Sequence, residues 1–201
     1  MLELVFVIVV AGILAAVFIP RFERDNAGEA AYQIARHIRL AQHHALVEDR
    51  FNAPNATTWK ATFWRITFVS GSKGQCYQVW ADRNASTGTI PSNDEKAVDP
   101  LTKKYVWGGT TCSDTQANVN QDVLLWKSYG VTTLTVGDGT IPKNVAFDHL
   151  GRPGQITNLV FTPLADNCVI SIDTNDGHSA EITVYKETGF VKVTKIDATD
   201  L

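Results

Sequence analysis

The stretch ELVFVIVVAGILAAVFIPR, residues 3–21, decides the N-terminal part of the fold. No charged or strongly polar residue lies between Leu4 and Ile19, whereas Glu3 stands directly before this run and Pro20 follows it. As a helix, with a rise of about 1.5 Å per residue, the run falls short of a hydrocarbon core of ~30 Å. The pattern has three interpretations. The first is a cleaved signal peptide, although such a peptide should begin with positive charge and this segment begins with Glu3. The second is a plain membrane anchor. The third is a helix in which the acidic residue itself has a functional role.

The composition predicts a folded chain without the charge of a nucleic-acid-binding protein. Hydrophobic residues make up 44% of the 201 residues and charged residues 19%, so a packed core is expected. The length suits one ordinary domain with an appendage, or one larger domain. Because 18 basic residues stand against 21 acidic ones, the net charge is −3 and the basic excess of a nucleic-acid-binding protein is missing.

Beyond Pro20 the sequence continues with the pattern of an amphipathic helix. One apolar stripe recurs there at three- and four-residue spacing, formed by Ile34, Ile38, Ala41 and Ala45. Pro20 removes one backbone donor and should bend the helix rather than end it, because helix-forming residues lie on both sides. We therefore expect one long helix over residues 1–50, which ends at the breakers in FNAPNATTW (51–59).

From residue 51 onward the sequence has the pattern of strands. WKATFWRITFVS (59–70) and QCYQVWAD (75–82) flank the turn GSKG, which predicts a hairpin. A three-stranded meander is predicted over residues 168–196, because DTNDGHS and KETG separate alternating runs. The fold class is therefore α+β, with a long N-terminal helix that packs its stripe on an antiparallel β-sheet.

The N-terminal segment MLELVFVIVVAGILAAVFIPRF closely resembles the N-terminus of type IV pilins and type II secretion pseudopilins. Its first residues align with the end of that superfamily's Phe-Thr-Leu-x-Glu-Leu signature, Glu3 with the signature glutamate, and Pro20 with the helix-kinking proline. The leader and the Phe-Thr pair are absent, so we expect Met1 to be an internal methionine taken as the start. The alternative is an unprocessed relative of the superfamily.

A second resemblance concerns the C-terminal half. VAFDHLGRPG (145–154), together with the strands that follow it, resembles the GspH/FimT family of minor pseudopilins and minor pilins, in which a Phe-x-x-x-Gly-Arg segment precedes the closing hairpin. The two resemblances imply a pilin-like fold. Residues 1–50 form its N-terminal helix, transmembrane over about 2–20 and amphipathic over 21–50, and residues 51–201 form a β-rich periplasmic domain.

The resemblance also implies a role for the N-terminal residues. Glu3 and Pro20 are the expected assembly residues, because the glutamate of one subunit neutralises the N-terminal amine of its neighbour. A charge at membrane depth costs on the order of 3 kcal/mol, which such a partner offsets. The residues expected in the membrane helix are Leu4, Val5, Phe6, Ile8, Gly12, Ile13, Leu14, Phe18 and Ile19.

The function implied is that of a structural minor pilin or pseudopilin subunit. Its partners are other pilins or pseudopilins in a helical filament, a prepilin peptidase, the inner-membrane assembly platform and the lipid of the bacterial inner membrane. The chain would cross that membrane once, with its C-terminal domain in the periplasm or on the filament surface. The alternatives are a DNA-binding minor pilin that serves DNA uptake and a membrane-anchored binding module outside any filament.

Three cysteines, Cys76, Cys112 and Cys168, lie far apart in the sequence and in no CxxC pattern, so no zinc site is expected. In an oxidising compartment two of them could pair and the third would be left over. We predict a bridge from Cys112 to Cys168, which would tie an irregular loop to the sheet. Cys76 is an equal candidate partner for Cys112.

Residues 83–121 show no regular period, and irregular connections of this size are often functional. Four aspartates in or beside this segment could supply oxygen ligands to calcium, namely Asp94, Asp99, Asp114 and Asp122. No EF-hand spacing is present, so we expect solvated loop acids. DTNDG (173–177) looks similar to a calcium loop but is predicted to be a hairpin turn.

The sequence contains no motif of an enzyme. His37, His43 and His44 form no i, i+4 pair for zinc and are predicted to lie on the polar face of the helix. A nucleophile elbow, a P-loop and a dinucleotide-binding fingerprint are absent, so we expect no catalytic residues, cofactor or metal. TFWRITF (62–68) could be a stacking platform for single-stranded nucleic acid, but its alternation favours a two-faced strand.

Overall fold

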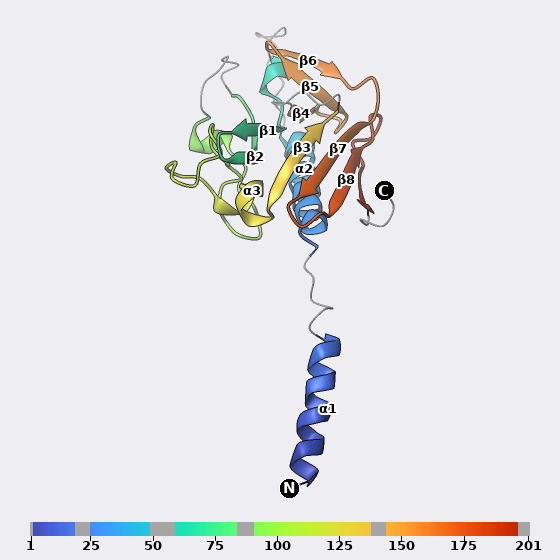
Figure 1. Cartoon of the computed structure of the whole chain (residues 1–201). Coiled ribbons are helices and arrows are strands. Elements are labelled where there is room, and N and C mark those ends of the chain that lie inside the picture. Colours follow the sequence, from blue (N-terminus) through green and yellow to red (C-terminus); the bar gives the residue numbers. More distant parts are fainter. Residues whose placement is uncertain (1, 19–24, 49–58, 84–90, 138–143, 197–201) are drawn as a thin grey trace.

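The computed structural model describes residues 2–18, 25–48, 59–83, 91–137 and 144–196. The larger part of the described chain is a β-rich body, in which two antiparallel sheets lie beside one helix (Figure 1). A second helix, at the N-terminus, lies apart from the body in Figure 1.

The first sheet contains the predicted hairpin. Its strands are β1 (Arg65–Gly71), β2 (Gly74–Trp80), β4 (Asn144–Phe147), β5 (Pro153–Thr157) and β6 (Val160–Pro163), in the spatial order β2-β1-β4-β5-β6. In the hairpin, Arg65 pairs with Trp80 at one end and Gly71 with Gly74 at the other. The prediction of a turn at GSKG is therefore confirmed.

The second sheet contains the predicted meander. Its strands are β3 (Val131–Val136), β7 (Cys168–Thr174), β8 (Ser179–Val184) and β9 (Val191–Ile196), in the spatial order β3-β7-β8-β9. Burial alternates along β7 and β8, as expected for strands with one face on a core. The three-stranded meander of β7, β8 and β9 is confirmed, and β3 extends it at one edge.

Two separate helices, α1 (Leu2–Phe18) and α2 (Asn26–Val47), stand where one long helix was predicted. The start of α2 has a local cause, because the Asp25 carboxylate accepts a hydrogen bond from the backbone N–H of Gly28 at 2.7 Å. A side chain in this N-cap position satisfies a donor that has no partner within the helix. The predicted bend at Pro20 lies outside the described residues, as do the breakers between residues 52 and 55.

The core of the body lies between α2 and both sheets. Strands β1, β2 and β4 of the first sheet and β7, β8 and β9 of the second all contact α2. The predicted stripe is confirmed, because Ile34, Ile38 and Ala41 are fully buried and Ala45 is 7% exposed. Further small residues on this face, including Ala27, Ala30, Ala31 and Ala35, are also fully buried and allow the strands to approach the helix closely.

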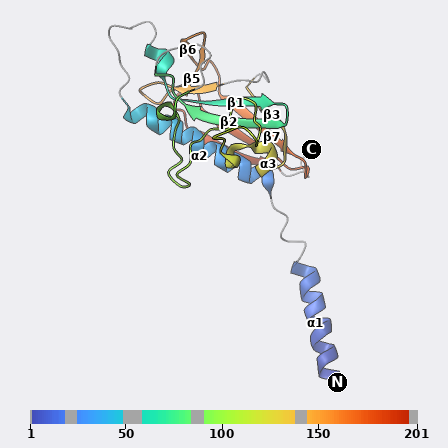
Figure 2. The ribbon, with the colours of Figure 1, turned by 90° about the vertical axis from the view of Figure 1, so that its left-hand side faces the viewer.

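Residues 91–130 cover part of the first sheet without forming a regular strand. Their short helices are η4 (Asn93–Glu95), η5 (Gln121–Val123) and α3 (Leu125–Ser128), and another, η3 (Trp59–Thr62), precedes β1. Isolated bridges join Lys96 to Trp80, Trp107 to Gln78 and Val98 to Tyr105. Residues 91–130 are therefore held in place by specific contacts. Figure 2 shows its loops on the side of the body that faces the viewer.

The predicted fold class is wrong. In place of one long helix on one sheet, the described chain has two antiparallel sheets and helices that do not exceed 22 residues. The strands of the hairpin and the meander were recognisable, but their patterns do not specify which strands share a sheet, because residues of both sheets face the same helix.

The membrane-spanning interpretation is also wrong. Within the described residues, no helix combines the length and the apolar character needed to cross a membrane. Helix α1 has 17 residues. At its rise per residue this corresponds to ~26 Å, less than a hydrocarbon core of ~30 Å. This finding overturns the transmembrane helix and the single-pass location in the bacterial inner membrane.

Candidate functional site

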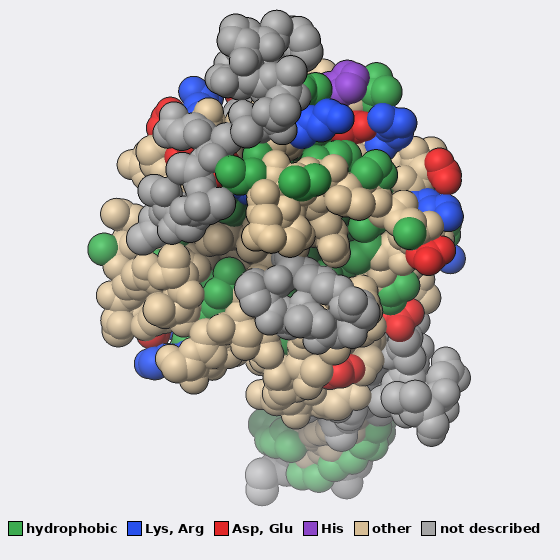
Figure 3. Space-filling model, turned by 90° about the horizontal axis from the view of Figure 1, so that it is seen from above, with side chains coloured by type: hydrophobic (Ala, Val, Ile, Leu, Met, Phe, Trp, Pro, Cys, Tyr) green, Lys and Arg blue, Asp and Glu red, His purple; other side chains and the backbone are tan. Residues whose placement is uncertain are grey.

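Helix α1 exposes an apolar surface on all its sides. Residues 3–14 are all exposed, and among them the side chains of Leu4, Phe6 and Ile8 are 66%, 68% and 62% exposed. In Figure 3, which looks down on the body, α1 is the fainter, largely hydrophobic surface at the lower edge. Folded chains rarely expose contiguous apolar surface of this kind unless it marks an interaction site.

Glu3 lies in the first turn of α1 and is the helix's only charged residue. An acidic side chain is favoured there, because the free N–H groups give the N-terminus of a helix a partial positive charge. Of the residues predicted for the N-terminal helix, seven lie on α1 with exposed positions, namely Leu4, Val5, Phe6, Ile8, Gly12, Ile13 and Leu14. Phe18 is the last residue of α1, whereas Ile19 and Pro20 lie outside the described residues.

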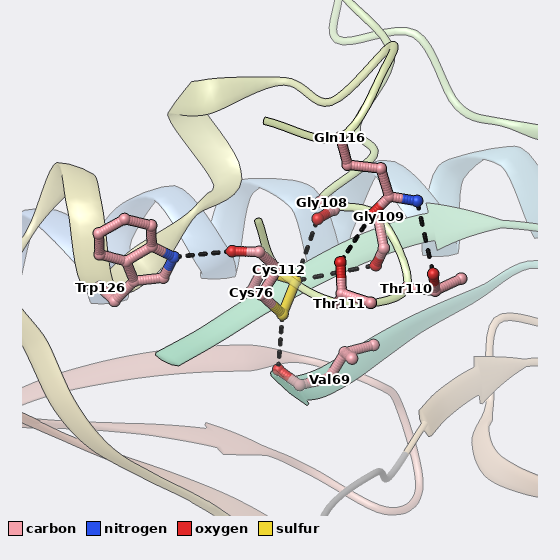
Figure 4. Close-up of a disulfide and its surroundings, with 9 residues drawn as sticks. All are labelled: Val69, Cys76, Gly108, Gly109, Thr110, Thr111, Cys112, Gln116 and Trp126. Atoms are coloured by element: carbon pink, nitrogen blue, oxygen red, sulfur yellow. Dashed lines mark hydrogen bonds between the residues drawn. A yellow bond between two sulfur atoms is a disulfide. The ribbon is translucent and has the colours of Figure 1, made fainter. Parts of the chain in front are cut away.

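One disulfide links residues 91–130, called the irregular segment below, to the first sheet (Figure 4). It joins Cys76 on β2 to Cys112, with their Cα atoms 5.4 Å apart. The predicted bridge from Cys112 to Cys168 is therefore wrong, and the alternative partner, Cys76, is the one that Cys112 uses. Cys168 is buried at the start of β7, on the second sheet, whereas Cys112 packs with Cys76 and Leu124 in a small cluster of its own.

The surroundings of the disulfide fix its position. Trp126 donates a hydrogen bond from its indole N–H to the carbonyl of Cys112 at 2.9 Å (Figure 4). Gly108 passes so close to Cys76 that a Cβ atom on it would lie 2.8 Å from the sulfur atom. Both cysteines are fully buried, so the bridge is a structural element rather than an accessible thiol pair.

Asp99 joins the irregular segment to α2. Its carboxylate accepts hydrogen bonds from the backbone N–H of Leu101 and the hydroxyl of Thr102, both at 3.0 Å. The same carboxylate accepts a hydrogen bond from the guanidinium of Arg36 at 3.1 Å, and Nε2 of His37 lies 3.6 Å away. Asp99 is 2% exposed, so the expectation of a solvated loop acid is wrong for this residue.

His37 is buried in a polar network within the body. Its Nδ1 lies 2.6 Å from the hydroxyl of Tyr77, which also accepts a hydrogen bond from the side chain of Gln33 at 3.2 Å. Gln33 in turn accepts a hydrogen bond from Tyr129. The prediction that His37 lies on the polar face of the helix is wrong, because the segment 91–130 covers this part of α2. His43 is exposed, and the ring of His44 stacks on Trp64.

The pKa values in this network follow from burial and from its charged members. Burial and, to a lesser extent, the positive charge of Arg36 lower the pKa of His37 to about 4. The negative charge of Asp99 raises this pKa but does not outweigh the other two effects. Burial opposes the charged form of Asp99 too, but the hydrogen bonds from Leu101 and Thr102 and the charge of Arg36 outweigh it, so its pKa lies below the ordinary value. Burial raises the pKa of Tyr77. At neutral pH the network therefore contains an anionic Asp99 and a neutral His37.

A cavity of about 330 Å³ opens beside this network. The side chains that line it are all polar and include Gln33, Arg36, His37, Asp99, Asp122 and Tyr129. Most of them already hydrogen-bond to one another, whereas ordinary small-molecule sites are lined predominantly by apolar side chains. Among the residues that the structure describes, no group of His, Cys, Asp and Glu is arranged to hold a metal ion.

The other loop aspartates lie at separate places on the surface. Each pairs with a different base: Asp94 with Arg83, Asp114 with Lys127, and Asp122 with Lys104. The structure therefore does not bring these carboxylates together. DTNDG forms the turn between β7 and β8, where Asp176 accepts hydrogen bonds from Thr174 and from the N–H of His178, so the predicted hairpin turn is confirmed.

The aromatic residues of TFWRITF are buried and cannot stack on exposed bases. Phe63 and Trp64 are each 4% exposed and Phe68 is fully buried. Arg65 stacks over the ring of Trp80 at 3.9 Å, and burial lowers its pKa to about 10. The alternative of a nucleic-acid platform on this strand has no exposed surface to support it.

Comparison with known proteins adds no relative. No family model, no curated protein and no solved structure matches this chain. The resemblance of the N-terminus to pilins therefore stays a prediction. The feature that a proposed function has to explain is helix α1, which is apolar, exposed and contains a single acidic residue.

Proposed function

We propose that this chain is a structural subunit of a pilin-like filament, of the kind formed by type II secretion pseudopilins and type IV pilins. It joins other subunits through α1, while the β-rich body stays outside the helical bundle. The observation that carries the proposal is the exposure of α1, whose residues 3–14 are all exposed although Glu3 is their only charged member.

The energetics of α1 favour association with other apolar helices. Full burial of a Val, Leu, Ile or Phe side chain contributes roughly 1.5–3 kcal/mol relative to exposure in water. Of the twelve residues from 3 to 14, nine are large and apolar, and the others are Glu3, Ala11 and Gly12. Gly12 has open space around it. Small residues allow helix backbones to approach one another closely.

Glu3 would fix how neighbouring α1 helices align along their axes, because apolar contacts alone do not specify one alignment. A carboxylate that enters an apolar bundle requires a partner charge, and the partner that we propose is the positively charged N-terminal amine of a neighbouring subunit. A nonspecific aggregate has no such requirement. Loss of the acid should therefore impair ordered assembly without impairing apolar aggregation.

The test uses two differently tagged copies of the full chain, expressed together, and measures the fraction recovered in sheared filaments. Val9→Asp, in the middle of α1, should reduce this fraction at least about tenfold, because a charge enters the apolar interface. Val160→Asp is the matched control, since Val160 is a similarly exposed valine on the body and its change should have no effect.

Glu3→Ala separates assembly from aggregation. The proposal expects loss of filaments with an unchanged or larger aggregated fraction, because the apolar surface of α1 is retained. Equal recovery of Glu3→Ala and the unmodified chain in filaments would contradict the role of Glu3. Equal recovery of Val9→Asp would contradict the proposed function itself.

A further inference from the structure

A rigid hairpin, residues 98–105, projects from the irregular segment. The N–H of Asp99 donates a hydrogen bond to the carbonyl of Lys104, and the N–H of Lys103 donates one to the carbonyl of Asp99, both at 2.9 Å. At the tip, Leu101 is 74% exposed, which makes it the most exposed large hydrophobic side chain of the described body. Lys103 and Lys104 follow it and are both exposed.

Several contacts anchor this hairpin to the rest of the body. The buried Asp99 carboxylate holds the hairpin to Arg36 on α2, and a bridge between Val98 and Tyr105 closes its base. Further along the chain, the disulfide at Cys112 fixes the same segment to β2. A preorganised tip loses little conformational entropy on binding, so its exposed leucine is well placed for a protein contact.

A recess of about 370 Å³ lies beside the connection from β6 to β7. Pro163, Leu164 and Ala165 line its apolar part, and Asp166, beside them, is 96% exposed. Lys186 donates a hydrogen bond to the carbonyl of Ala165 at 2.6 Å and lies 3.9 Å from the Asp166 carboxylate. Because that ion pair is loose and exposed, the carboxylate is available to a second cation.

The hairpin and the recess lie on different sides of the body. In Figure 1 the green-to-yellow irregular segment lies on the left, whereas the orange connection from β6 to β7 lies on the right. Figure 2 shows the irregular segment facing the viewer when the body is seen from that left side. A tip on one side that fits a recess on the other makes a heterologous contact, which repeats along an open chain of subunits.

We propose that the hairpin tip of one copy docks into the β6–β7 recess of a second copy, with Leu101 in the apolar part and Lys103 beside Asp166. This contact rests on the proposed function and adds to it a lateral contact between bodies that does not involve α1. The opposite charges orient the approach, and the apolar contact between Leu101 and the recess provides the affinity.

A charge exchange between full-length chains tests the pairing. Lys103→Glu alone sets a carboxylate of the tip against Asp166, and Asp166→Lys alone sets an ammonium group of the recess against Lys103. Each variant should therefore assemble at least about tenfold less well than the unmodified chain. When the two variants are mixed, both kinds of contact become complementary again. The mixture should recover assembly, in filaments that alternate the two chains. Failure of the mixture to recover, or full assembly of either variant alone, would overturn the proposal.

Leu101→Asp and a photo-cross-linker at position 101 locate the contact. Leu101→Asp should weaken assembly, whereas Leu150→Asp should leave it unchanged, since Leu150 is a comparably exposed leucine elsewhere on the body. The cross-link should map to residues 163–166 of a differently tagged copy. A cross-link elsewhere, together with assembly that still depends on Val9, would reject the lateral contact and leave the proposed function standing. Loss of the dependence on Val9 would instead reject the proposed function.

Discussion

His37 is neutral in the folded body because its surroundings oppose the charged form. Burial lowers its pKa from 6.5 to about 4, and Arg36 adds to the shift. The unfolded chain therefore binds a proton more readily than the folded chain between these two values. The stability contributed by the neutral ring is fully present above pH 6.5 and is lost as the pH falls through the folded pKa of about 4.

The prediction is a pH dependence that depends on His37. On going from about pH 7 to about pH 5, the free energy of unfolding should fall by roughly 1–2 kcal/mol, within a maximum of ~3 kcal/mol set by the full shift. Urea unfolding at both pH values measures it. In His37→Gln this decrease should shrink, whereas His43→Gln, at an exposed histidine of the same helix, should keep it. An equal decrease in all three chains would contradict the assignment.

Asp99 and Asp122 give a second prediction, because two loop aspartates of similar sequence context differ in burial. Asp99→Ala removes several hydrogen bonds to a buried carboxylate and should lower the free energy of unfolding by roughly 2 kcal/mol, since hydrogen bonds to charged groups are worth 1.5–3 kcal/mol and Arg36 regains water. Asp122→Ala removes an exposed pair with Lys104 and should cost less than about 1 kcal/mol. Equal losses in urea unfolding would contradict this difference.

The sequence did not distinguish these two aspartates, for a physical reason. Asp99 and Asp122 both lie in or beside a segment without a period, and the local pattern of each is that of a solvated acid. Only the tertiary placement of the segment on α2 brings Arg36 and His37 to Asp99. Buried polar networks form between residues far apart in the chain, so periodicity carries no information on them.

At the scale of elements, the disulfide from Cys76 to Cys112 connects strand β2 to a segment that forms no regular strand. Its closed loop spans 36 residues, for which the chain-entropy model gives a stabilisation of about 4 kcal/mol. Reduction should therefore lower the free energy of unfolding by up to that amount. In the double variant Cys76→Ala, Cys112→Ala the reductant should have no effect, and a remaining effect there would implicate another bond.

Prediction from sequence succeeded for elements whose signals are local. The hairpin of β1 and β2, the meander from β7 to β9 and the buried stripe of α2 each have their own period and turn residues. It failed at Asp25, where an N-cap begins a second helix that the continuing helical pattern concealed. It also left the partner of Cys112 open between Cys168 and Cys76, because a bridge depends on the distance between Cα atoms, which no spacing in the sequence reveals.

At the scale of the whole molecule, the body and α1 differ in whether their apolar residues are buried. The body has a buried core of its own, in which Ile34, Ile38 and Phe147 are fully inaccessible between α2 and the sheets. Helix α1 leaves its apolar residues from Leu4 to Leu14 exposed. The body's stability should therefore be independent of α1, whereas association of the chain should depend on it.

Val9→Asp tests this separation within one chain. Val9 is 52% exposed on α1, so the substitution creates no cavity and buries no charge in the body. The free energy of unfolding of the body should change by less than about 0.5 kcal/mol, as is usual for surface positions. Ile38→Ala, at a fully buried position of α2, should lower it by roughly 2–5 kcal/mol because it leaves a cavity. Urea unfolding, followed by tryptophan fluorescence from the body, measures both, while sedimentation of the same samples measures association. If Val9→Asp destabilised the body as much as Ile38→Ala does, α1 would be part of the body's core, and its exposed surface could not serve assembly.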